Sequence, residues 1–116
     1  SGNILFDTIS EGWSGRERIC VLLPKGNRLR ERFVKEKGRI LSFTVQLEGL
    51  FEQQWKPIVR YDTAHGFAHI HILHSDGSAK RIAVPVPDFN TALSFAQRDI
   101  KNNWEQYRET FEKEAK

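Results

Sequence analysis

Residues 41–48 read Leu-Ser-Phe-Thr-Val-Gln-Leu-Glu, so that every apolar side chain is followed by a polar one. Side chains of a β-strand alternate between the two faces of a sheet, and a period of two therefore predicts a strand with one face in the core and one in water. An amphipathic helix would instead repeat its apolar residues every three to four positions. This stretch predicts a sheet with one covered face.

Further strands are predicted on both sides of this stretch. Turn sequences such as Ser75-Asp76-Gly77-Ser78 separate them, and Asp and Gly tolerate the positive φ that a tight hairpin requires. Because short turns join strands that are neighbours in space, we expect an antiparallel meander. The predicted strands cover residues 18–23, 57–61, 67–74 and 80–84.

The end of the chain follows a helical pattern. Pro85-Val86-Pro87 interrupts the strands, Asp88 is a favourable N-cap, and apolar residues then recur every three or four positions from Phe89 to Phe111. The predicted fold is α+β: an antiparallel meander sheet of four to five strands, with one long C-terminal amphipathic helix packed on one face. Residues 16–116 are expected to form this single domain. Residues 1–15 are set apart as a disordered or tag-derived segment, because Ser1-Gly2 is typical of a cleaved purification tag.

The composition excludes several classes of protein. No apolar run approaches the roughly 20 residues that span a bilayer, and Cys20 is the single cysteine, so neither a membrane helix nor an intramolecular disulfide is expected. The sequence contains no phosphate-binding Walker loop, dinucleotide fingerprint, Gly-x-Ser-x-Gly elbow or His-Glu-x-x-His motif. We therefore expect a cytoplasmic protein that needs no cofactor.

Positive charge is concentrated in one part of the chain. Residues 16–39 contain nine Lys or Arg against three Glu, whereas the whole chain carries a net charge of only +3. Leu29 and Phe33 are four residues apart, which permits a short basic helix over residues 28–37. Such a stretch is either a solvated surface or a surface that contacts nucleic-acid phosphates. The candidate phosphate contacts are Arg28, Arg30, Arg32, Lys35, Lys37 and Arg39.

All four histidines lie within residues 65–74, and two of them share one face of a predicted strand. On a strand over residues 67–73, Ile70 faces the core while His69 and His71 project from the open side of the sheet. If Asp62 pairs with Phe67 across the turn, Arg60 lies opposite His69; a slip of one residue would replace Arg60 by Tyr61. On the other side of the strand, Arg81 comes near His71.

Three interpretations of this patch compete. Two imidazoles can transfer protons during metal-independent RNA cleavage, with His69 and His71 as the acid–base pair and with Arg60 and Arg81 stabilising the phosphate. The histidines can bind a metal ion together with the rim residues Asp62, His65 and His74. They can also form a plain solvated strand surface. Because the positive charge of Arg60 beside the imidazoles opposes a cation, the sequence favours no bound metal.

The segment from Arg60 to His71, Arg-Tyr-Asp-Thr-Ala-His-Gly-Phe-Ala-His-Ile-His, resembles the small TumE-type toxins of prokaryotic toxin–antitoxin pairs and related small domains of unknown function. The resemblance is centred on residues 58–82. It implies a short α+β fold with a histidine-rich hairpin, and a DNA-binding antitoxin as the partner.

Two functions are therefore expected from the sequence. The first is a toxin-like protein of a toxin–antitoxin pair that acts on or binds nucleic acid, most simply RNA, through the histidine and arginine patch. The second is a non-catalytic module that binds nucleic acid or protein, in which the histidines form a solvated or partner-facing surface. A homodimer is kept as an alternative to a monomer.

Overall fold

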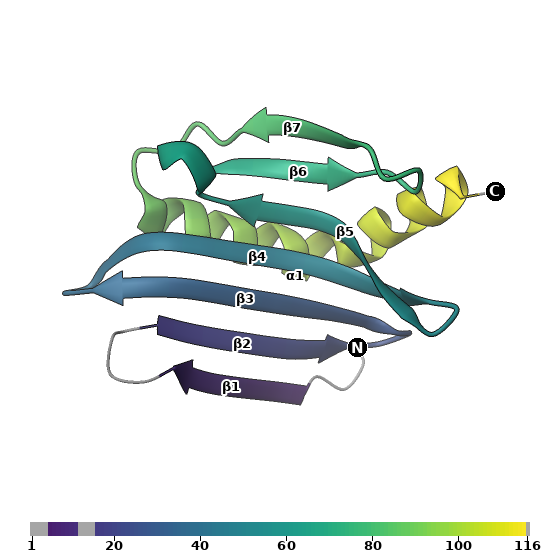
Figure 1. Cartoon of the computed structure of the whole chain (residues 1–116), viewed down its shortest axis with the longest axis horizontal. Coiled ribbons are helices and arrows are strands. Elements are labelled where there is room, and N and C mark those ends of the chain that lie inside the picture. The colour runs from purple at the N-terminus through teal and green to yellow at the C-terminus, as the bar shows by residue number, and fades with distance from the viewer. Residues whose placement is uncertain (1–4, 12–15, 116) are drawn as a thin grey trace.

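The computed structural model describes residues 5–11 and 16–115, and it contains one antiparallel sheet and one long helix (Figure 1). The elements follow the chain as β1 (Leu5–Glu11), β2 (Arg16–Leu23), β3 (Asn27–Glu36), β4 (Arg39–Phe51), β5 (Gln54–Asp62), the 3-10 turn η1 (Ala64–Gly66), β6 (His69–Leu73), β7 (Ala79–Ala83) and α1 (Phe89–Glu114). The α+β class, the antiparallel meander and the C-terminal helix are confirmed. Among the described residues, no helix has the length and apolarity needed to cross a membrane.

The sheet is larger than the sequence indicated. Its seven strands lie side by side in chain order, β1 to β7, and every neighbouring pair is antiparallel. The expected count of four to five strands was therefore wrong. One additional strand, β1, lies within the segment 1–15 that the sequence set apart, while the tag-like Ser1-Gly2 lies outside the described residues.

The other additional strand is β3, where the short basic helix was expected. Leu29, Glu31 and Phe33 alternate with exposed or half-exposed arginines, and the strand pairs with β2 on one side and β4 on the other. The prediction was wrong because residues four apart share a face of a strand as well as of a helix. Lys37 and Gly38 have φ of 50° and 79°, so they form the tight turn of a hairpin rather than a helix end.

The core lies between one face of the sheet and α1, which crosses behind β4 and β5 in Figure 1. Asp88 is the N-cap as predicted: its side chain accepts a hydrogen bond from the Thr91 amide at 2.7 Å. The helix buries Ala92, Ala96 and Ile100 against the sheet. The most deeply buried hydrophobic residues of the strands are Val45, Leu47, Ile58, Val59 and Tyr61.

Polar contacts fix the helix to the sheet at two places. Asp99 of α1 accepts hydrogen bonds from the hydroxyls of Tyr61 at 2.6 Å and Tyr107 at 2.7 Å. Burial and the carboxylate of Asp99 raise the pKa of both phenols, so both stay protonated and act as donors. Further along the helix, Arg108 donates to the Gly26 carbonyl at 2.9 Å and to Asn27 Oδ1 at 3.0 Å. These contacts hold the helix in one register over the strands.

A charged side chain of β3, that of Glu31, faces the core. Glu31 of β3 lies opposite Val45, is 8% exposed, and accepts a hydrogen bond from Gln97 of α1 at 2.6 Å. Burial raises the pKa of Glu31, and the hydrogen bond from Gln97 lowers it by less. A raised pKa means that the folded state binds the proton more tightly than the unfolded chain does, so this contribution to stability is present at low pH and is lost as the pH rises through the folded-state pKa.

We therefore expect Glu31→Gln to raise the melting temperature at pH 7.5, because it removes a buried charge and keeps an acceptor for Gln97. The advantage should shrink as the pH falls toward the ordinary glutamate value of 4.5, because the raised pKa means that Glu31 in the native protein takes up its proton before that value is reached. Thermal melts at several pH values measure this. Glu31→Ala serves as the control: it also removes the buried charge but leaves Gln97 without its partner, so it should be less stable than Glu31→Gln by about 1 kcal/mol at every pH. A lower melting temperature for Glu31→Gln at pH 7.5 would contradict the interpretation.

Candidate functional site

The face of the sheet that α1 leaves uncovered carries two rows of side chains that run across the strands. The cross-strand pairing defines both rows. The first row is Arg18, Arg32, Thr44, Asp62 and His69. The second row is Cys20, Arg30, Gln46, Arg60, His71 and Arg81. Two surfaces that the sequence analysis treated separately, the basic stretch and the histidine hairpin, therefore lie on one face, which we call the open face.

Only part of the predicted basic stretch belongs to the two rows and their immediate neighbours. Arg28, Arg30 and Arg32 are two residues apart on β3 and project from the open face together. The other three predicted contacts, Lys35, Lys37 and Arg39, are exposed around the β3–β4 turn. A register shift between Val34 and Lys35 separates that turn from the alternation of the arginines. The six predicted residues thus form two groups rather than one arm.

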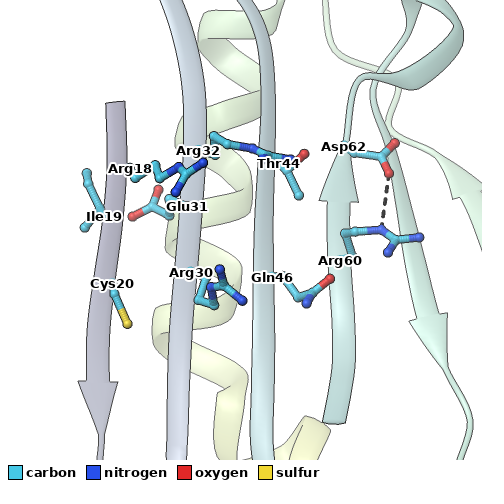
Figure 2. A pocket seen from close by; sticks show the side chains of 10 residues that line it. All are labelled: Arg18, Ile19, Cys20, Arg30, Glu31, Arg32, Thr44, Gln46, Arg60 and Asp62. Atoms are coloured by element: carbon cyan, nitrogen blue, oxygen red, sulfur yellow. Dashed lines mark ion pairs between the residues drawn. The ribbon is translucent and has the colours of Figure 1, made fainter. Parts of the chain in front are cut away.

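A hollow of about 500 Å³ lies over the middle of the open face. Figure 2 shows side chains from β2 to β5 around it, with Arg30 and Gln46 pointing toward the viewer, away from the helix. Arg18, Thr44 and Gln46 are among the lining residues that sequence reasoning missed. The alternating stretch predicts that Thr44 and Gln46 face water. It does not predict which strands lie beside them, and so it could not place them next to the arginines.

Two of the arginines share one carboxylate. Arg28 Nε lies 2.6 Å from Glu48 Oε1, and Arg30 lies 3.6 Å from Glu48 Oε2. The guanidinium of Arg28 also stacks over the Trp55 ring at 4.0 Å. Arg28 is therefore held in place, whereas the side chain of Arg30 is 56% exposed and accessible to a ligand.

The pairing of β5 with β6 differs from the prediction by two residues. Asp62 pairs with His69 instead of Phe67, and Arg60 consequently lies opposite His71 instead of His69. The reason is a longer connection, which includes the 3-10 turn with His65 at φ 68°. A shift of two keeps every side chain on its predicted face. The expected neighbourhood of His71 and Arg81 is confirmed by their direct pairing.

His69 faces away from the helix as predicted, but it is not exposed. Its side chain is 1% exposed, because its ring stacks on that of Phe67 with the centroids 4.9 Å apart and lies tilted against that of His71 with the centroids 5.0 Å apart. His65, on the 3-10 turn, lies 6.5 Å away. The expected exposed patch was wrong at this residue, because aromatic neighbours from its own hairpin cover the ring.

Asp62 lies at the centre of the histidine cluster rather than at its rim. Its Oδ1 is 3.6 Å from His69 Nε2, and its Oδ2 is 3.4 Å from His71 Nε2 and 3.3 Å from Arg60 Nε. All three nitrogens are buried and lack a hydrogen-bond partner. Burial lowers the pKa of His71 and outweighs the opposite effect of Asp62, so this ring is neutral at pH 7. The three side chains Asp62, His69 and His71 bring potential metal-ligand atoms within 4.8 Å of one another.

His74, another predicted rim residue, points elsewhere. His74 Nδ1 lies 2.8 Å from Glu114 Oε2, near the C-terminal end of α1. This contact keeps His74 away from the cluster.

Burial of His69 can be tested by chemical modification. We expect diethyl pyrocarbonate to modify the exposed His65 readily and His69 last, because reaction requires access of the reagent to a ring nitrogen. Mass spectrometry of peptides from briefly treated protein gives the rate for each histidine. In guanidinium chloride the difference should disappear. Equal rates for His65 and His69 in the folded protein would contradict the described cluster.

Comparison with known proteins gives a family and little more. Residues 14–116 match the family described as domain of unknown function DUF7718. No curated protein and no solved structure matches the chain. Because the match covers the whole helix and β2 to β7, the chain belongs to the DUF7718 family.

Proposed function

We propose that the open face binds single-stranded nucleic acid, with RNA as the substrate class. The observation that carries this proposal is the charge of the uncovered face. In the regularly paired part of β2 to β7, which excludes the β3–β4 turn beyond the register shift, the carboxylates on this face are those of Glu48 and Asp62. The arginines on it are Arg16, Arg18, Arg28, Arg30, Arg32, Arg60 and Arg81. A surplus of this kind attracts a polyanion.

The extent of the charge favours a chain of phosphates over a single small anion. Neighbouring strands are about 4.8 Å apart, so β2 and β7 are separated by roughly 24 Å. Successive side chains on one face of a strand are about 7 Å apart, which separates the two rows by the same distance. One phosphate group would contact only a few of these arginines. A strand laid across the face would contact several.

The aromatic side chain at the end of the first row supports a single-stranded ligand. Phe67 is 53% exposed while one face of its ring stacks on His69. An exposed aromatic ring beside basic side chains is the usual means of stacking an unpaired base.

Of the two functions expected from the sequence, the geometry supports binding better than proton transfer. The Nδ1 atom of His69 is hydrogen-bonded to the Phe67 carbonyl at 2.9 Å, and Nε2 is directed to Asp62. Because the ring is 1% exposed, neither nitrogen is accessible to a ribose hydroxyl on the open face. The proposal includes the toxin-like role that the resemblance implies, as an effect of RNA binding. It also includes a DNA-binding antitoxin as the partner protein.

Salt dependence tests the phosphate contacts. We expect the affinity for a fluorescein-labelled single-stranded RNA to fall as NaCl rises. Arg30→Gln/Arg32→Gln should flatten the log–log slope by about 1.4, because each phosphate that is no longer neutralised lowers the slope by about 0.7. The control is Arg98→Gln/Lys101→Gln, which removes the same charge from the outer side of α1. Equal slopes for the two double variants would contradict a role for the open face.

The toxin-like role is tested by induced expression in a bacterial host. We expect the native chain to arrest growth, Arg30→Gln/Arg32→Gln to relieve the arrest, and Arg98→Gln/Lys101→Gln to preserve it, because only the first pair lies on the open face. Growth curves after induction, at matched protein levels, give the result. Unimpaired growth with the native chain would remove the toxin-like role and leave the binding proposal to the salt experiment.

A further inference from the structure

We propose that Asp62, His69 and His71 form a binding site for one divalent transition-metal ion. The site lies at the β5–β6 end of the two rows. It goes beyond RNA binding, because it needs no nucleic acid. Two independent observations carry it: the ligand-type atoms of the three residues converge within 4.8 Å, and His69 Nε2 is buried without a hydrogen-bond partner.

The hydrogen bond at Nδ1 of His69 determines whether Nε2 carries a hydrogen or a lone pair. A carbonyl oxygen only accepts hydrogen bonds, so the 2.9 Å contact with Phe67 means that Nδ1 carries the hydrogen. In the neutral ring Nε2 then carries the lone pair, and it faces the Asp62 carboxylate at 3.6 Å. Two acceptors facing each other in a buried place are unfavourable unless a cation lies between them. A backbone carbonyl on the opposite ring nitrogen is also the usual support of a metal-binding histidine.

The distances fit a small ion. A tetrahedral zinc ion with ligands at 2.0–2.1 Å separates its ligand atoms by about 3.3 Å. The carboxylate oxygens of Asp62 lie 3.6 Å from His69 Nε2 and 3.4 Å from His71 Nε2. Small rotations of half-buried side chains would complete the geometry. Asp62 and His71 each retain 15% exposure of their side chains, which gives the ion a path to the site.

Arg60 is the feature that argued against a metal in the sequence. In the structure its Nε lies 3.3 Å from Asp62 Oδ2, and its side chain is 37% exposed. The buried Nε of Arg60 therefore faces Oδ2, the oxygen that also faces His71, while Oδ1 is directed to His69. A partner for a ligating carboxylate is a common outer-shell arrangement in metal sites. The proposed site thus departs from the expectation based on charge alone.

The ligand types select the class of metal. Two imidazole nitrogens and one carboxylate suit zinc, cobalt, nickel or ferrous iron, whereas calcium and magnesium require oxygen ligands. Three protein ligands leave at least one coordination position for water or a phosphate oxygen.

Metal titration of the full chain, without a histidine tag and after treatment with a chelator, tests the site. We expect Zn²⁺ to bind at one ion per chain in isothermal titration calorimetry and to raise the melting temperature by mass action, and we expect Ca²⁺ to do neither. Co²⁺ should bind with visible absorption bands that report its coordination. No zinc binding, or equal binding of calcium, would overturn the proposal.

Matched variants separate this site from other histidines. Asp62→Asn and His71→Gln should each weaken zinc binding about tenfold or more, since each removes one ligand. His74→Gln removes one histidine from the same hairpin but outside the cluster, and it should bind zinc as the native chain does. Unchanged affinity in both ligand variants, or equal loss in His74→Gln, would also overturn the proposal. RNA binding measured with chelator present reports on the proposed function separately.

Discussion

The packing of α1 against β4 and β5 is the contact on which the rest of the molecule depends. One helix of 26 residues can cover only one face of a seven-stranded sheet. Small side chains at Ala92 and Ala96 bring the helix close, and Ile100 reaches the buried strand residues beneath it. Burial of this apolar surface supplies the main stabilisation. Because strand side chains alternate, every second residue of β2 to β6 is thereby directed to the uncovered face, whatever its chemistry.

The positive charges on the open face repel one another and so destabilise the folded protein. Arginines that lie close together, such as Arg30 and Arg32 two residues apart on β3, repel each other. Within the regularly paired part of β2 to β7, only Glu48 and Asp62 provide opposite charge on this face. Water and salt reduce the repulsion at an exposed surface. The same surplus of positive charge is the reason that we propose a polyanion as the ligand of this face.

The histidine cluster differs from the arginine rows in burial rather than in location. His69 is closed off by its neighbours Phe67 and His71, and it shares the Asp62 carboxylate with His71. Buried polar atoms without partners are rare in folded proteins, and here His69 Nε2 and His71 Nε2 are both directed to one carboxylate. The open face therefore combines two kinds of chemistry, an exposed array of guanidinium groups and a shielded set of ligand atoms at its end.

The sequence by itself determined the local features. The alternation at residues 41–48, the turn at Ser75–Ser78 and the N-cap Asp88 each depend on neighbours in the chain, and all appear in the structure. The faces of His69 and His71 were predictable for the same reason. Which strands lie side by side was decided by the tertiary structure, which made a strand of residues 27–36, where a helix was expected, and put its arginines on one face with the histidines. Pairing, register and the covering of His69 depend on contacts between residues distant in sequence, which a local pattern does not encode.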